Sequence, residues 1–432
     1  HHHYLPAAFL RAAPNSALLL CGGLLRARCW LRPPRFPRCH PGAPWHRPAP
    51  PPPRQAASMS EEEARRKAEK PVVSEDIARG IAEALFGVKA ASVKEMDSYD
   101  DRNFYIRSEG DGTEYTLKVH NGVESLDTGL VRAQVEVMLH LAGHGVPCPV
   151  AVATPAGDDF GWRELPLAGG GPRRHAVKLL TWVPGVIMGS VQQSPALLRD
   201  AGKMIGKMAR ALSTFDHPAI HREHMWDLAQ TALLEDFTGH IDDAAKRATV
   251  EGIIEEFKAA VLPRAEELPK GCLQNDPNEQ NLLVDPQGTR VVGVIDFGDL
   301  IWSWKVNEIA IGLAYCMLEK EDPVASAGMM LAGYLEEAEL APAEWEVLPT
   351  LIASRLACSV TMGMYAYSLD PANEYLLVTQ KPGWAALEVL RGRPSGEIGA
   401  ALGEAAGGWW WCLIGGWPVL EVLWQGRGNV MQ

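Results

Sequence analysis

Two carboxylates and an amide stand at the ends of apolar runs between residues 273 and 299. Asp276 follows one apolar run, Asn281 comes five residues later, and Asp296 ends the next run. Phosphoryl transfer needs a carboxylate that orients the attacking hydroxyl and accepts its proton, and oxygen ligands that hold magnesium against the phosphates. Asp276 can supply the base, and Asn281 and Asp296 the ligands. The pattern predicts this chemistry, with turn formation at strand ends as the alternative.

A lysine stands in the strand-like segment 114–119, far upstream of these residues. From there, Lys118 could reach the α- and β-phosphates of a nucleotide. Because lysine is rarely buried without a partner, we expect one on the following helix, where Gln134 and Glu136 are both candidates. Taken alone, Lys118 would more often be a solvated strand residue. A strand lysine, an Asp with Asn five residues later, and Ile-Asp-Phe-Gly, in that order, favour a kinase-type site.

The polar segment 97–103 is predicted to be a turn between two strands, where a kinase covers the nucleotide phosphates. It has no Gly-x-Gly pattern, so cradling of phosphates by backbone N–H groups is less evident. Ser98 and Asn103 are the predicted phosphate contacts. A hairpin turn with solvated acids is the alternative.

The surrounding pattern changes from strands to helices along the chain. It predicts a helix from Ser74 to Gly87, hairpin strands over 92–119, a helix over 131–141, a strand over 175–182 and helices from Ser194 onward. Turn chemistry at Pro184-Gly185 separates the two parts. This order predicts an α+β fold, with a nucleotide-binding lobe at 70–183 and a catalytic and substrate-binding lobe at 184–390.

Both ends of the chain differ from the middle in composition. Residues 1–58 contain eight arginines, no acidic residue and 12 of the 32 prolines, so we expect a disordered extension before Met59. Residues 391–432 are rich in Gly and Trp, and no structure or function is predicted for them.

Composition excludes some classes of function. The 432 residues carry 41 Lys and Arg against 53 Asp and Glu, a formal charge of -12, which argues against a broad basic face for nucleic acid. No uninterrupted apolar run reaches 18 residues, so no membrane span is predicted. The eight cysteines form no Cys-x-x-Cys pair, which is typical of a reducing compartment. We therefore expect a cytoplasmic protein with no nucleic-acid or membrane partner, while its oligomeric state stays open.

Several segments together resemble the aminoglycoside phosphotransferase family of small-molecule kinases, over about residues 70–390. They are 98–104, 117–118, 276–281 and 295–299, with further likeness at 182–185, 221–228 and 381–384. The resemblance implies a protein-kinase-like fold of two lobes and the use of Mg2+. It also implies transfer of the terminal phosphate of GTP, with ATP as another possible donor, to the side-chain hydroxyl of 5-hydroxy-L-lysine.

The resemblance also assigns roles to individual residues. It implies that Asp276 is the catalytic base, that Asn281 and Asp296 are the magnesium ligands, and that Lys118 anchors the phosphates. A cationic acceptor would favour an acidic pocket, for which Asp299 and Glu308 are candidates, although Glu308 is equally well interpreted as a solvated helix residue.

Two positions depart from the family pattern. Gln274-Asn275 replaces the usual His-Gly before the catalytic Asp, and the usual helix glutamate falls at Gln134. These departures leave open a catalytically weak, kinase-like nucleotide-binding protein. Since the catalytic residues do not encode the acceptor, a kinase for another small amine or an amino sugar is a further alternative.

Overall fold

The structure is a computed structural model that describes residues 59–167, 170–369, 371, 377 and 379–408. The predicted extension at 1–58 lies outside the described residues, as do the last residues of the Trp-rich tail, 409–432. The first part of that tail is described, and it contains a helix at Ser395–Ala405 for which the sequence predicted no structure.

The N-terminal half is built on a five-stranded antiparallel sheet. Its strand order is β1-β2-β3-β5-β4, with β1 Ala90–Met96, β2 Arg102–Ser108, β3 Glu114–Val119, β4 Gly161–Leu167 and β5 Gly170–Thr181. Alternate residues of β2 and β3, among them Phe104 and Leu117, are buried beneath helix α2 (Glu75–Phe86). Ser74 caps the start of α2 and Gly87 ends it in the left-handed conformation, as predicted.

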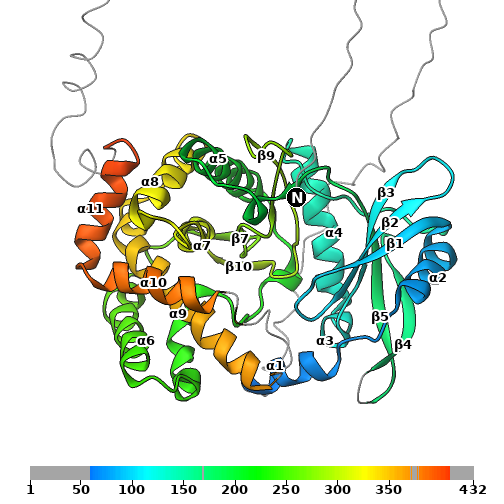
Figure 1. Cartoon of the computed structure of the whole chain (residues 1–432), viewed down its shortest axis with the longest axis horizontal. Helices are drawn as coiled ribbons and strands as arrows, with labels where there is room; N and C mark the ends of the chain where they lie inside the picture. Colours follow the sequence, from blue (N-terminus) through cyan, green and yellow to red (C-terminus); the bar gives the residue numbers. More distant parts are fainter. Residues whose placement is uncertain (1–58, 168–169, 370, 372–376, 378, 409–432) are drawn as a thin grey trace, which may run out of the picture. The chain divides into compact units, whose positions relative to one another are not determined.

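Helices flank this sheet and connect it to the rest of the chain. Helix α1 (Met59–Ala68) precedes the sheet. The short α3 (Gly122–Ser125) and the longer α4 (Thr128–Gly143) follow β3. Figure 1 shows α4 between the sheet and the helical C-terminal region.

The C-terminal half is mostly helical, which confirms the predicted α+β class. Its α-helices in the described residues are α5 Pro195–Leu212, α6 Ala244–Glu256, α7 Val306–Cys316, α8 Pro323–Tyr334, α9 Pro342–Leu369, α10 Gln380–Arg391 and α11 Ser395–Ala405. Helices α5 and α8 pack closely because Gly202 and Gly333 let the two backbones approach.

Two small sheets lie among these helices and carry the chemistry-bearing loops. One pairs β7 (Lys270–Leu273) with β10 (Ile301–Trp304), and the other orders β6 (Val186–Ile187), β8 (Leu282–Val284) and β9 (Val291–Val294). The segment with Asp276 joins β7 to β8, and the segment with Asp296 joins β9 to β10. The strands that these loops leave, β7 and β9, are mostly buried.

Helix α9 is long and apolar enough to cross a membrane by length and composition. In the structure, however, 89% of its most apolar window is buried inside the protein, and its buried face includes Arg355. We interpret α9 as the central helix of the C-terminal core.

Candidate active site

Gln274 holds the two loops against each other. Its Nε2 donates to the backbone carbonyl of Asp296, and its Oε1 accepts from the backbone N–H of Asp276 at 2.9 Å. Gln274 thus supplies both a donor and an acceptor, as a neutral histidine in this place could, so it is able to brace the loop. Asp276 and Asp296 are thereby brought into one site.

Asn275 adopts a backbone conformation that favours glycine. Its φ is 69°, in the left-handed region, which asparagine tolerates better than most residues. Its amide is fully buried, and neither the nitrogen nor the oxygen has a hydrogen-bond partner among the described residues. The loop therefore keeps the turn that a glycine would make, but it buries an unpaired amide to do so.

The Asp276 carboxylate is held by three side chains. Oδ1 accepts from Arg355 Nη2 at 2.7 Å, and Oδ2 accepts from the Nδ2 atoms of Asn278 and Asn281, each at 2.8 Å. Burial raises the pKa of Asp276 to about 6, the nearby Arg355 cation opposes this rise, and the negative charge of Asp296 adds to it. The carboxylate is thus fixed in place and is a stronger base than a free aspartate.

Asn281 and Asp296 each keep one oxygen available. Asn281 uses its amide nitrogen on Asp276, and Asp296 uses Oδ1 to accept from Lys118 and from the Gly298 N–H. In the described part of the chain, neither Asn281 Oδ1 nor Asp296 Oδ2 accepts a hydrogen bond. Mg2+ prefers a carboxylate and amide oxygens of this kind, so the predicted ligand pair fits the ion.

Lys118 reaches the site from strand β3. Its Nζ lies 3.1 Å from Asp296 Oδ1 and 3.0 Å from Asp101 Oδ2. Burial alone would lower the pKa of Lys118, but the two carboxylates outweigh it and hold the pKa well above its ordinary value. The three distant stretches that carry Lys118, Asp276 and Asp296 therefore meet in one place.

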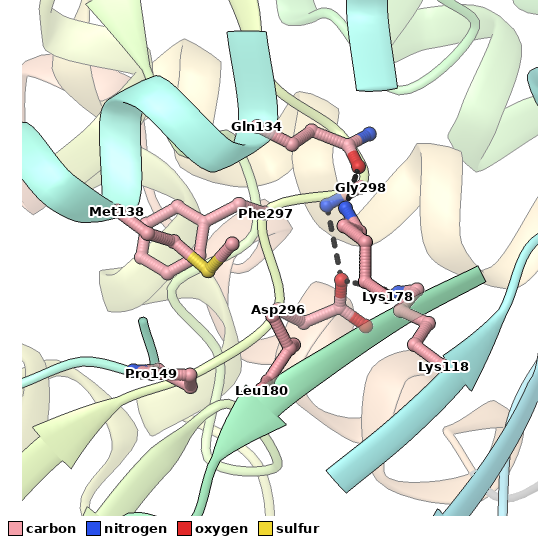
Figure 2. Close-up of a pocket in the computed structure, with 9 residues that line it drawn as sticks. All are labelled: Lys118, Gln134, Met138, Pro149, Lys178, Leu180, Asp296, Phe297 and Gly298. Atoms are coloured by element: carbon pink, nitrogen blue, oxygen red, sulfur yellow. Dashed lines mark hydrogen bonds and ion pairs between the residues drawn. The ribbon is translucent and has the colours of Figure 1, made fainter. Parts of the chain in front are cut away.

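The predicted helix partner of Lys118 is wrong. Glu136 is exposed on α4, and Gln134 binds a different lysine, Lys178 of β5, whose Nζ lies 2.5 Å from Gln134 Oε1. Lys118 and Lys178 are directly opposite each other in the β3–β5 register, so both side chains leave the same face of the sheet. Figure 2 shows the two lysines lining one pocket with Asp296 and Gln134.

Lys178 is a buried lysine without a direct carboxylate partner in the described hydrogen bonds and ion pairs. Its side chain is 2% exposed, and burial, reinforced by the neighbouring Lys118 charge, lowers its pKa to about 7. Gln134 connects Lys178 to an acid, because Gln134 Nε2 donates a hydrogen bond to Glu124 Oε1 at 2.5 Å. Lys178, Gln134 and Glu124 thus form a hydrogen-bonded chain of three residues beside Lys118.

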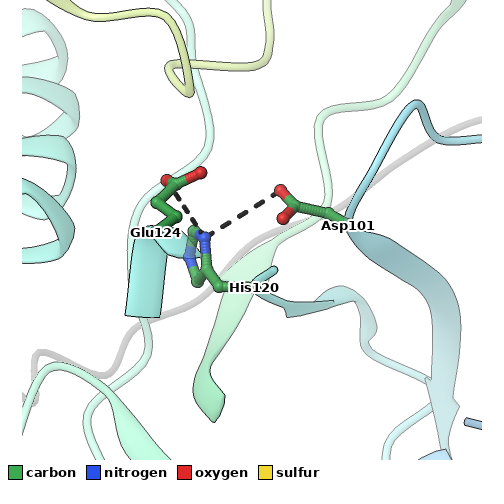
Figure 3. Close-up of side chains that lie close together, drawn as sticks. All are labelled: Asp101, His120 and Glu124. Carbon is green, nitrogen blue, oxygen red and sulfur yellow. Dashed lines mark ion pairs between the residues drawn. The ribbon is translucent and has the colours of Figure 1, made fainter. Parts of the chain in front are cut away.

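A buried histidine completes this polar network. His120 Nδ1 lies 3.2 Å from Glu124 and 3.9 Å from Asp101, as Figure 3 shows. The three residues are close enough together to hold a metal ion, but Lys118 already pairs with Asp101 and supplies the positive charge. Burial lowers the pKa of His120, so its ring is neutral. We therefore regard the cluster as a support for Lys118.

The turn between β1 and β2 lies beside Lys118. Ser98 Oγ donates to the Asp101 carbonyl within the turn, while the Ser98 and Tyr99 carbonyls accept from Lys70 Nζ at 3.2 and 3.0 Å. Asn103 pairs with Lys118 in the strand register, and its buried Oδ1 has no partner among the described residues. Phosphate contacts from Ser98 and Asn103 remain predictions.

Asp299 and Glu308 lie in different environments. Asp299 is partly exposed beside His224, at 3.5 Å, and burial together with the charges of Asp276 and Asp296 raises its pKa to about 7. Glu308 is 1% exposed, and its Oε2 accepts from the Asn275 backbone N–H. Glu308 therefore braces the loop that carries Asp276, and the prediction of a solvated helix position for it is wrong, while its contact with the acceptor stays a prediction.

Sequence reasoning missed Asp101, Glu124, Lys178, Asn278 and Arg355. Arg355 left a detectable signal, since it is the only charged residue between Val347 and Leu369. A lone charge in an apolar helix must find a partner in the core. The other four look like ordinary polar residues of turns and strands.

Comparisons with known proteins agree with this geometry. A model of the phosphotransferase enzyme family matches residues 92–348. Hydroxylysine kinase of Xenopus laevis is 33% identical over 339 residues, which cover 74% of this chain and 90% of that relative. Hydroxylysine kinase of Mus musculus is 31% identical with the same coverage.

Solved structures share the fold. Amicoumacin kinase hAmiN, in complex with AMP-PNP, Ca2+ and Ami, superposes with a TM-score of 0.57 at 18% identity, over 78% of this chain and 97% of that one. This likeness confirms the predicted kinase-like fold class.

Proposed function

Because the chain belongs to the phosphotransferase enzyme family and is a small-molecule kinase with a hydroxyl acceptor, we propose that it transfers the terminal phosphate of GTP to 5-hydroxy-L-lysine. The four vertebrate relatives at 30–33% identity, which bear the name hydroxylysine kinase, support this acceptor. The main structural support is the meeting of Lys118, Asp276 and Asp296, since a triphosphate anchor, a base and a metal ligand are needed together.

In this proposal each residue has one task. Lys118 holds the α- and β-phosphates, and Asn281 and Asp296 hold Mg2+, which when bound neutralises charge on the phosphates. Asp276 orients the acceptor hydroxyl and receives its proton. The hydroxyl oxygen bonds to the γ-phosphorus while the bond from that phosphorus to the β–γ bridging oxygen breaks, which leaves GDP.

The acceptor charge has a counterpart at the site. Asp299 lies close enough to Asp276 for the charge of Asp276 to raise the pKa of Asp299, and Asp299 is partly exposed. We propose that it binds an ammonium group of the acceptor.

We also propose that the N-terminal lobe binds the nucleotide and the C-terminal lobe the acceptor. A cytoplasmic location is proposed because the cysteines in the described residues are free thiols.

The decisive assay is GDP release with magnesium and 5-hydroxy-L-lysine. L-lysine is the matched acceptor control because it lacks only the hydroxyl, and ATP replaces GTP in a parallel series. Release that requires the hydroxyl supports the proposal. Equal release with L-lysine, or turnover of a choline-like alcohol or amino sugar instead, would refute the acceptor.

The proposed base is tested by Asp276→Asn. We expect turnover to fall by about 100-fold or more, because the amide keeps the shape but cannot accept the proton. Asp242→Asn, at an exposed position, is the matched control. Nucleotide binding should persist in both variants, and wild-type turnover of Asp276→Asn would exclude this role.

A further inference from the structure

We propose that Arg355 of helix α9 is a positioning residue that orients the Asp276 carboxylate toward the acceptor hydroxyl, an inference that rests on the proposed kinase function. Arg355 lies 79 residues after Asp276 in the chain and outside the family-matched segment 92–348. It reaches the catalytic loop from the centre of the C-terminal core.

The Arg355 guanidinium is held in a fixed position. Its side chain is 2% exposed, Nη2 donates to Asp276 Oδ1 at 2.7 Å, and Nη1 donates to the Trp226 carbonyl at 3.0 Å. Its Cζ lies 5.1 Å from the centre of the Trp226 ring and 5.3 Å from that of Tyr315. These two hydrogen bonds and two aromatic neighbours hold the guanidinium in one orientation.

The hydrogen bonds leave one direction open on the Asp276 carboxylate. Each carboxylate oxygen can accept two hydrogen bonds. Asn278 and Asn281 occupy both directions on Oδ2, while Arg355 occupies one of the two on Oδ1. The remaining direction is on Oδ1, so the acceptor hydroxyl gives its proton to that atom. Arg355 therefore decides which way the reactive lone pair points.

A purely structural role accounts poorly for this arginine. Nε of Arg355 is buried and has no hydrogen-bond partner in the described residues. An apolar side chain could fill the same space in the core without the cost of burying a charge. When both members of a buried ion pair are replaced by apolar residues, the stability of the protein is often unchanged or increased. The buried cation is explained by the carboxylate that it holds.

The test uses Arg355→Met and Arg355→Lys in the full chain, with kcat and both KM values measured alongside thermal stability. Arg355→Met should lower kcat by about 100-fold, because a misplaced catalytic group costs about that much, and Arg355→Lys should recover part of it. The KM for the nucleotide should change less than about threefold, since Lys118 and the proposed metal ligands are retained. Arg199→Met, which removes an exposed arginine of α5, should leave kcat unchanged.

The double variant Asp276→Asn with Arg355→Met keeps the proposal testable if Arg355→Met unfolds. It should be more stable than Arg355→Met, because no unpaired carboxylate is left buried, and its kcat should equal that of Asp276→Asn. Wild-type kcat in Arg355→Met would overturn the inference, as would additive losses in the double variant. Turnover by the wild-type protein in the same assay tests the proposed function separately.

Discussion

The buried lysine of strand β5 leads to a prediction about stability in which the size of the effect depends on pH. Lys178 is 2% exposed, and its pKa is lowered from 10.5 to about 7 by burial and by Lys118. This difference corresponds to about 5 kcal/mol of unfavourable free energy for the charged form in the folded state. We expect Lys178→Met to remove that cost, because methionine fills a similar volume without a charge.

The pH window follows from the direction of the change in pKa. Below about pH 7 the lysine is charged in both the folded and the unfolded state, so the folded protein carries the full cost. Between about pH 7 and 10.5 only the unfolded state keeps the proton, so the free energy of unfolding rises with pH. The advantage of Lys178→Met must therefore shrink as the pH increases.

The variant also loses the hydrogen bond to Gln134, and an unpaired buried acceptor costs about 1–3 kcal/mol. The net gain in the free energy of unfolding should be about 2–4 kcal/mol at pH 6 and about zero at pH 9. Urea unfolding followed by tryptophan fluorescence at pH 6, 7.5 and 9 measures it. Lys94→Met, at an exposed position of β1, is the matched control. A difference from wild type that is the same at every pH would refute the reasoning.

Four further predictions follow from particular contacts. Asn275→Gly should raise the free energy of unfolding by about 1 kcal/mol in urea titrations, because it relieves a positive φ and removes an unpaired buried amide. Lys70→Met should raise the KM for the nucleotide several-fold, since the turn that we expect to cover the phosphates loses the cation that binds two of its carbonyls. Gly202→Ala should lower the melting temperature, because the added Cβ would overlap the α8 backbone. Gly80→Ala should instead raise the free energy of unfolding by about 0.5–1 kcal/mol, because Gly80 lies in helix α2 with open space around it. A chain that begins at Met59 should match the full chain in melting temperature and turnover, and a loss of either would show that the basic extension contributes to the fold.

Local patterns predicted the elements of the fold well where they depend on short-range geometry. The cap at Ser74, the glycine that ends the helix at Gly87 and the β2–β3 hairpin all occur as expected, because each is decided by residues a few positions apart. Helix α1 was not predicted, because this polar segment has no strong apolar period. Helix Ser395–Ala405 was missed because its glycines, which disfavour helices, made the segment resemble a linker, although its alanines favour a helix.

The partners of the site residues could not be predicted in the same way. Lys118 was expected to pair with the following helix, yet it binds Asp101 from the preceding turn, while Gln134 binds Lys178. Glu308 looked like an acid near the acceptor, but the folding of α7 buries it under the catalytic loop. These outcomes depend on which faces of packed elements meet, and a single sequence does not contain that information.

By itself, the sequence determined the chemical parts of this protein and their order: a strand lysine, a loop with Asp276 and Asn281, and a following Asp296. Their spacing along the chain is fixed by the covalent sequence, so it is known without a structure. Only the tertiary structure decided that Arg355 holds the Asp276 carboxylate, since an ion pair between residues 79 positions apart forms only when the helices of the core pack. A buried charge must be paired across the fold, and its partner is selected by packing rather than by distance along the chain.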